Sequence, residues 1–348
     1  MNTFNVRGYW LLSCGGYSLL LPKRASVAAG GLITALALAC AMSLASGSAN
    51  IGPFTAFTAL LGAGDPMNVF LVRELRLERL LAGLFTGAAL GIAGCLLQTL
   101  ARNRLATPGV IGIDDGATAF AVASIVALPT SLAPSALALI GAFTAAALAF
   151  GLGGGSGARG YRFIVVGIGV GAVFGALTNL MLARTDLDSA NQAYPWTVGT
   201  LNARPWLAVQ ILGISLLFAV PAAMALNRAL GTMRFSDNVA RGLGVQITRV
   251  RGMTLALTVL LTGLAVAVVG PVGLIALAAP EMARYLTGHR GVPIIGAGLA
   301  GALLMVIADW AGRTWFAPTE IPVGIITALV GGPYLLWILI RQPARKTP

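Results

Sequence analysis

Long apolar stretches, separated by short polar gaps, follow one another along almost the whole chain of 348 residues. Most of them run for about 17–22 residues without the alternation of a barrel strand, so they predict membrane-spanning helices. Only helical bundles and closed barrels satisfy the backbone polar groups inside lipid. The pattern therefore predicts an all-α polytopic membrane protein with ten spans, at residues 26–46, 79–100, 108–128, 134–153, 163–183, 206–226, 252–270, 272–286, 293–312 and 322–340.

These spans form one predicted transmembrane domain at residues 26–341, with a short segment at each end. Residues 1–25 contain an apolar run that is too short to cross a bilayer and has no convincing cleavage site for a signal peptide. We interpret them as a cytoplasmic or interfacial extension. Residues 342–348 form a C-terminal tail.

One sizeable polar segment interrupts the apolar pattern, at Ser236–Arg251 with the sequence SDNVARGLGVQITRVR. Ser236 or Asp237 can cap a short helix, and the glycines after it can end that helix. Gln246–Arg251 is then expected to begin a second short helix that leads into the next span. The resulting hairpin is predicted to carry its apolar residues on one side, namely Val239, Leu243, Val245 and Ile247. A solvated loop would have fewer apolar residues and no cap, so we predict a cytoplasmic knob that docks into a groove of a soluble protein.

Composition and charge support the membrane assignment and orient the spans. The chain is 57% hydrophobic and 10% charged, whereas soluble domains have about 25% charged residues. The net charge of +12 lies in alternate gaps, as the positive-inside rule predicts for cytoplasmic loops, so nucleic-acid binding is not expected. Both termini are then cytoplasmic, and the inner gaps hold Arg102, Arg104, Arg159, Arg162, Arg228 to Arg251, Arg284, Arg290, Arg341, Arg345 and Lys346.

The gap at residues 47–78 departs from this rule, because it falls outside the membrane yet holds Arg73 and Arg76, with Arg79 directly after it. Glu74 and Glu78 partly neutralise these arginines. One interpretation is an interfacial segment whose arginines reach lipid headgroups. The other is a docking surface for an acidic external partner. Charge alone favours the first.

Glycine faces on two spans predict close helix packing. Gly87, Gly91 and Gly94 on the second span suggest ordinary tight packing, whereas Gly167, Gly171 and Gly175 on the fifth follow a glycine-rich loop at Gly151–Gly160 and suit a helix that lines a pathway and shifts. The eighth span is bounded by Gly270–Pro271 and is expected to be short and broken by Pro280.

Acidic residues at membrane depth are candidates for function by default. Glu281 has Arg284 three residues on, and Asp309 has Arg313 four residues on, so we prefer structural ion pairs for both. Only Asp114 and Asp115 remain as acids for ion coupling, and they lie near a span end. The single histidine, His289, lies in a gap, and the spacing of Cys14, Cys40 and Cys95 suggests neither a metal site nor a disulfide. The polar residues of the predicted spans do not form a catalytic set for an intramembrane enzyme.

Four stretches give the chain a resemblance to the permeases of the iron-siderophore and cobalamin ABC importers, the FecCD-like type II importers. They are Arg76–Gly112, the polar segment with its ARGLGV core, GPVGLIALAAPEMAR at Gly270–Arg284, and Ala308–Ile340. The resemblance covers about residues 50–341. It implies ten helices per permease, a pair of permeases that are identical or homologous, two cytoplasmic ATPase subunits, an extracytoplasmic substrate-binding protein, and a bacterial inner-membrane location.

The resemblance also implies roles for individual residues. The segment between helices 6 and 7 would couple to the ATPase, through Ser236, Asp237, Ala240, Arg241, Gly242, Leu243, Gly244 and Val245. Arginines matching Arg76, Arg79 and Arg313 receive acidic residues of the binding protein, which reverses the preference for lipid contact and weakens a plain Asp309–Arg313 pair. Glu78 stands where the family has proline in this R-x-P-R pattern. The family's fifth helix lines the pathway, here with Gly167, Gly171, Gly175 and Asn179.

We therefore predict a permease subunit that imports a ferric siderophore, with cobalamin and haem as alternative cargoes. The sequence has no G-x-x-x-x-G-K-[ST] phosphate loop, so ATP and Mg²⁺ are expected on a separate ATPase chain and no cofactor or metal on this one. A secondary transporter would need a buried unpaired acid and would have no use for the polar knob. An intramembrane enzyme would need a catalytic set.

Overall fold

The structure is a computed structural model that describes residues 9–14, 17–47, 51–126, 133–153, 161–288 and 291–341. Nearly all regular structure in these residues is helical. The exception is an antiparallel hairpin of β1 (Tyr9–Cys14) and β2 (Tyr17–Pro22), which lies in the predicted N-terminal extension. His289, Arg290, residues 154–160 of the glycine-rich loop and the tail at 342–348 lie outside the described residues.

A helix occupies each of the ten predicted spans. Seven helices of the described part are long and apolar enough to cross a membrane. Helix α5 is shorter than the predicted span, at 14 residues, and α13 is short, at 13 residues, as predicted for the eighth span. The helices in the spans are α1 (Lys23–Ala45), α4 (Leu77–Ala101), α5 (Ile113–Val126), α6 (Pro134–Gly153), α7 (Tyr161–Arg184), α10 (Trp206–Met233), α12 (Ile247–Val269), α13 (Ile275–Thr287), α14 (Ile294–Thr314) and α15 (Val323–Arg341).

Short helices join these spans. They are α2 (Pro53–Leu60), α3 (Pro66–Phe70), the π-helical η1 (Leu71–Arg76), the 3₁₀ helix η2 (Pro108–Ile111), α8 (Leu187–Ala193), α9 (Pro195–Val198) and α11 (Asp237–Gly242). The segment at 47–78, which lies outside the predicted spans, is thus largely helical. One helix runs from Pro66 through η1 to Ala101, and it places Arg73, Arg76 and Arg79 on one continuous element.

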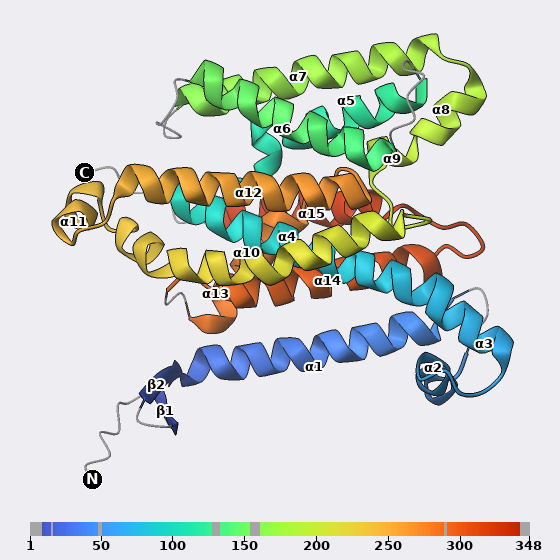
Figure 1. Ribbon diagram of the computed structural model, residues 1–348, viewed down its shortest axis with the longest axis horizontal. Coiled ribbons are helices and arrows are strands. Elements are labelled where there is room, and N and C mark those ends of the chain that lie inside the picture. Colours follow the sequence, from blue (N-terminus) through green and yellow to red (C-terminus); the bar gives the residue numbers. More distant parts are fainter. Residues whose placement is uncertain are drawn as a thin grey trace.

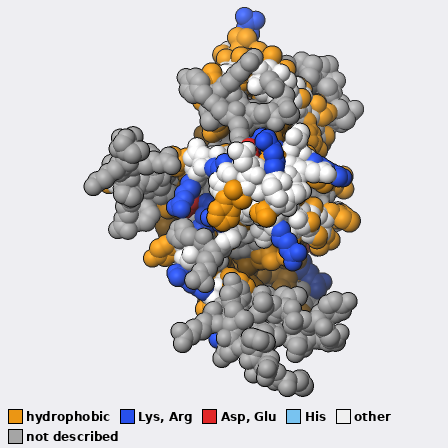
Figure 2. Space-filling view, turned by 90° about the vertical axis from the view of Figure 1, so that its left-hand side faces the viewer, with side chains coloured by type: hydrophobic (Ala, Val, Ile, Leu, Met, Phe, Trp, Pro, Cys, Tyr) orange, Lys and Arg blue, Asp and Glu red, His pale blue; other side chains and the backbone are white. Residues whose placement is uncertain are grey.

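The long helices lie side by side along one axis, so the molecule has two distinct ends (Figure 1). The inner end, as we name it, carries α11 and the beginning of α1, and the outer end carries α2, α3 and α8. Lysine and arginine side chains stand out on the inner end, where little acidic surface is visible (Figure 2). This distribution agrees with the predicted orientation, in which the inner end faces the cytoplasm.

Helix α4 lies in the middle of the bundle, where its glycines let other helices approach closely. A Cβ atom at Gly87 would lie 2.4 Å from the carbonyl oxygen of Gly301, and one at Gly91 would lie 2.2 Å from that of Ala297. At Gly94 the distance to the carbonyl oxygen of Ala276 would be 1.8 Å. Since no side chain fits at these distances, the prediction of tight packing for this face is confirmed.

The prediction that Pro280 breaks the eighth span is wrong, because α13 is continuous through that residue. Proline cannot donate to the carbonyl one turn earlier, which is that of Ala276. The side-chain amide of Gln98 on α4 instead donates to the carbonyl oxygens of Ala276, at 3.4 Å, and Leu277, at 3.3 Å. A polar side chain from a neighbouring helix thus satisfies the backbone group that proline leaves open.

Candidate functional sites at the two ends

The polar segment at the inner end forms a capped helix, as predicted. The Ser236 hydroxyl oxygen accepts a hydrogen bond from the backbone N–H of Val239 at 3.1 Å, and α11 then runs from Asp237 to Gly242. Gly244, with φ of +79°, reverses the chain. The expected second short helix is not separate, because Ile247 already begins α12, which continues to Val269.

Asp237 connects α11 to two other helices. One carboxylate oxygen lies 2.6 Å from Nη2 of Arg251 on α12, and the other lies 3.1 Å from Nη2 of Arg102 at the C-terminal cap of α4. Arg102 also donates from Nε to the carbonyl oxygen of Met233 at 2.7 Å. The cluster of Asp237, Arg102 and Arg251, which we call the inner clamp, therefore fixes α11 to both α4 and α12.

The sequence predicted that the apolar residues of the polar segment lie on one side of the hairpin. This prediction is wrong, because they divide between two sides. Ala240 and Ile247 are buried and Val245 is partly buried against the bundle, whereas Val239 and Leu243 are 48% and 65% exposed. Arg241 and Gly242 are also exposed. The buried residues therefore pack α11 and the start of α12 against the bundle. The two exposed apolar side chains, Val239 and Leu243, are available to a partner.

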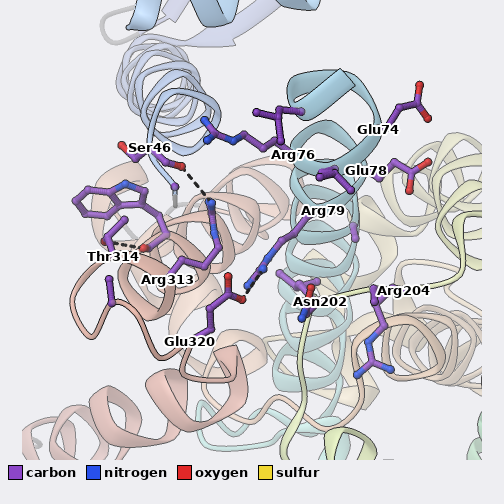
Figure 3. Close-up of a pocket in the computed structure, with 18 of the residues that line it drawn as sticks. Ser46, Glu74, Arg76, Glu78, Arg79, Asn202, Arg204, Arg313, Thr314 and Glu320 are labelled. Carbon is purple, nitrogen blue, oxygen red and sulfur yellow. Dashed lines mark hydrogen bonds and ion pairs between the residues drawn. The ribbon is translucent and has the colours of Figure 1, made fainter. Parts of the chain in front are cut away.

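At the outer end a cavity of about 980 Å³ brings together the three arginines predicted for docking. Arg76 and Arg79 extend from the η1–α4 helix and Arg313 from the end of α14, and Glu320 joins them from the α14–α15 connection (Figure 3). Residues far apart in the sequence thus form one charged site.

Two of these arginines are already paired within the chain. Arg79 lies 3.0 Å from an oxygen of Asp309 and 2.8 Å from one of Glu320. Arg313 lies 3.0 Å from the other oxygen of Asp309, so the pair expected from the four-residue spacing is present, and it also donates to Ser43 Oγ on α1 at 2.8 Å. Asp309 therefore organises the site from a buried position.

Arg76 holds the end of α1. Its Nη1 donates to the carbonyl oxygens of Leu44 and Ala45, at 2.6 and 3.1 Å. The three predicted docking arginines thus share one cavity, and each of them also contacts another part of the chain.

The cavity contains a further arginine that the sequence interpretation did not select. Arg204 donates from Nε to the carbonyl oxygen of Thr200 at 2.8 Å, and its guanidinium carbon lies 4.4 Å from the centre of the Trp196 ring. Burial lowers the pKa of Arg204 to about 10, which leaves it charged at neutral pH. Since Arg204 also lies in an outer gap, it breaks the positive-inside rule as Arg76 does, and that exception is the signal that could have revealed it.

The four residues of α7 that are predicted to line the pathway differ in their surroundings. Gly167 and Gly171 are buried: a Cβ atom on Gly167 would lie 2.4 Å from the carbonyl oxygen of Val110 in η2, and one on Gly171 would lie 2.6 Å from a carboxylate oxygen of Asp115. Gly175 has open space around its Cα, and Asn179 is exposed. Gly167 therefore lets α7 pack closely on η2, and Gly171 lets it pack closely on the beginning of α5. The other two positions are open to a partner or a pathway.

Comparison with known proteins identifies the family. The FecCD transport family matches residues 35–341. The chain belongs to the FecCD transport family. The prediction of a resemblance to these importer permeases is therefore confirmed, and the protein is a multi-pass transport permease of the bacterial inner membrane rather than an enzyme.

Individual relatives of this FecCD permease match along most of their length. It is 34% identical over 316 residues to the ferric enterobactin transport system permease protein FepG of Escherichia coli (strain K12), covering 90% of this chain and 96% of that protein. It is 37% identical over 310 residues to the Fe(3+)-citrate import system permease protein YfmE of Bacillus subtilis (strain 168), covering 88% and 92%. Identity to the hemin transport system permease protein HmuU of Yersinia pestis is 34% over 317 residues, covering 87% and 94%.

A solved structure shares the fold. It shows a metal-chelate type ABC transporter in an inward-facing conformation, with a TM-score of 0.77 and 23% sequence identity. The superposition covers 92% of this chain and all of that one. The arrangement of helices in this permease is therefore a fold already seen in a solved structure.

Proposed function

We propose that this permease is the membrane-spanning subunit of an ATP-driven ABC importer that carries a ferric siderophore delivered by an extracytoplasmic binding protein. The observation that carries the proposal is α11, a capped helix that is clamped to the bundle on one side and exposes Val239 and Leu243 on the other. A short helix with exposed apolar side chains suits insertion into a groove of a soluble ATPase. Relatives named for ferric enterobactin and ferric citrate support an iron chelate as the cargo.

The contacts suggest how movement of the ATPase reaches the bundle. The inner clamp joins α11 to Arg102, and the ten residues after Arg102 lead through η2 to Gly112. Helix η2 packs directly on Gly167 of α7, and Gly112 and Asp115, which follow η2, pack on Gly171. A displacement of α11 is therefore expected to shift α7, along which the cargo would pass.

The assembly is proposed to contain two ATPase subunits, which bind ATP and Mg²⁺, and two permeases. The permease named FepD is also a ferric enterobactin transport protein of Escherichia coli, and it is 34% identical to this chain, as FepG is. These two names favour a related chain as the second permease here, and an identical copy of this chain is the alternative.

The test replaces Leu243, which is 65% exposed, by aspartate in the complete importer. Leu243→Asp places a charge in the proposed apolar contact, so we expect the co-purified ATPase to fall at least about tenfold and ATP-driven uptake to fall with it. The matched control is Leu187→Asp, which changes a leucine that is 76% exposed on α8 at the outer end. Equal ATPase recovery from both variants would contradict the proposal.

A panel of labelled cargoes distinguishes the siderophore from the alternatives. We expect a strain lacking this permease to lose uptake of one ferric siderophore and to regain it with the intact gene. The similarity to HmuU makes haem the second candidate, and cobalamin belongs in the panel as the third. Loss of haem or cobalamin uptake alone would reassign the cargo but not the transporter class.

A further inference from the structure

Helix α2 carries a stripe of large apolar side chains on the surface of the outer end. The stripe consists of Phe54, Phe57 and, directly after the helix, Leu61, which recur at a spacing of three and four residues and so share one face. All three are exposed, Phe54 by 79%. No residue from 53 to 61 is charged. Exposed apolar patches mark sites of contact with another protein or with a membrane.

The opposite face of α2 holds the helix against the bundle. Ala56 and Ala59 are buried in a core that also contains Val72 of η1. At the end of α2, Arg73 of η1 donates from Nε to the carbonyl oxygen of Leu60 at 3.0 Å. These contacts fix the orientation of α2, with its apolar stripe turned away from the protein.

The length of α1 places α2 at the surface of the bilayer. The 23 residues of α1 span about 34 Å at about 1.5 Å per residue, slightly more than the hydrocarbon core of about 30 Å. The chain turns back at the end of α1, where the backbone N–H of Ile51 donates to the carbonyl oxygen of Ala45 at 3.1 Å. Helix α2 lies beside that end and does not continue the line of α1 (Figure 1). It is therefore level with the outer boundary between hydrocarbon and headgroups.

The stripe continues a surface that meets lipid. Only 17% of the most apolar stretch of α1 is buried within the protein, and Leu38 and Met42 are exposed in its outer half. Because α1 crosses the membrane, its uncovered side contacts lipid. The outer cavity, in contrast, is lined by no described residue of α2. Arg73 is exposed beside the end of α2, where a long basic side chain can direct its charge to the lipid headgroups.

We propose that α2 is an interfacial helix whose apolar stripe lies in the outer leaflet of the bilayer. Arg73 joins α2 to η1, and η1 continues into α4 with Arg76 and Arg79. The bilayer surface thereby sets the height of the outer cavity. The two interpretations of the gap at 47–78 then apply to different arginines: Arg73 lies at the lipid surface, and Arg76 lines the cavity. This inference does not depend on the cargo or on the ATPase, since it requires only that the chain spans a membrane.

The experiment measures how deeply a spin label on the stripe lies in lipid nanodiscs that hold the complete importer. Leu61→Cys carries the label in a variant without other cysteines. The control is Leu187→Cys, at another exposed leucine of the outer end, which lies between Asp186 and Asp188. Collisions of the label with oxygen, which concentrates in lipid, are compared with collisions with a nickel chelate, which stays in water. We expect the ratio of oxygen to nickel collisions to be at least about fivefold higher at residue 61 than at residue 187, because the apolar face of an interfacial helix lies about 5–10 Å into the boundary.

Three outcomes would overturn the proposal. The first is an equal collision ratio at Leu61→Cys and Leu187→Cys. The second is exclusion of nickel that appears only after the binding protein is added, because the stripe would then be a contact for that protein. The third is a low collision rate with both oxygen and nickel, because protein rather than lipid would then cover the stripe. If Leu61→Cys does not fold, Phe57→Cys makes the same measurement at a second position of the stripe.

Discussion

Asp237 is the residue on which the inner end depends, because it bridges α11 to α4 and α12. Its carboxylate and that of Asp309 have similar positions in their networks, each between two arginines and each mostly shielded from solvent. Removing the charge of Asp237 takes away the carboxylate that lies between Arg102 and Arg251.

We therefore expect Asp237→Asn to lower the free energy of unfolding by about 1–3 kcal/mol, discounted from a fully buried pair because Arg102 is one-third exposed. ATP hydrolysis should also lose its coupling to uptake, because α11 is no longer held against α4. Thermal unfolding of the importer and the ratio of ATP hydrolysed to cargo imported measure these effects. Asp188→Asn, at an exposed position on α8, is the control, and equal behaviour of the two variants would argue against the inner clamp.

For single residues, the sequence predicted only the contacts between side chains that are three or four positions apart. The Ser236 cap, the Glu281–Arg284 pair at 2.6 Å and the Asp309–Arg313 pair at 3.0 Å all follow from helical spacing. The pairing of Arg79 with Asp309 joins residues 230 positions apart, so it depends on the packing of α4 against α14 and has no local signal.

Helix α4 is the element that sets the packing of the bundle, and Gly94 is its closest point of contact. Because a Cβ atom there would lie 1.8 Å from the carbonyl oxygen of Ala276, Gly94→Ala must push α13 away from α4. We expect this substitution to lower the free energy of unfolding by about 1–3 kcal/mol, which thermal unfolding in detergent can measure.

The matched control is Gly252→Ala on α12, where a Cβ atom would meet nothing within 4 Å. Alanine is the better helix former by about 0.8–1.0 kcal/mol, so this variant is expected to be neutral or more stable. A Gly94→Ala variant as stable as Gly252→Ala would show that α13 can move without cost.

The apolar stretches of the sequence predicted where the long helices lie, but they did not predict all of the helix ends. The end of α10 lies at Met233, beyond the predicted span end at residue 226, because a helix can continue into the polar inner region where apolar length gives no signal. Conversely, α5 begins only at Ile113, because η2 and Gly112, with φ of +79°, occupy the first part of the predicted span.

The whole molecule is polarised, with α11 at one end and the arginine-lined cavity at the other (Figure 1). The positive-inside rule predicted this polarity, and the two exposed leucines already described can test it. The background is a variant of the protein without cysteine. In spheroplasts Leu187→Cys should react with an impermeant maleimide, whereas Leu243→Cys should react only in inverted membrane vesicles. The reverse labelling pattern would overturn the orientation.

Helix α4 reaches from one of these ends to the other. It carries Arg79 near its beginning and is capped by Arg102, and its 25 residues span about 37 Å at about 1.5 Å per residue. If the outer partner binds at the cavity that Arg79 lines, and the ATPase binds at α11, which Asp237 joins to Arg102, one rigid body senses both of them. Thermodynamic linkage then requires reciprocity: whatever factor the docked binding protein applies to the affinity of the importer for ATP, ATP must apply to the affinity for the binding protein. Two separate titrations of one complex should therefore return a single coupling free energy.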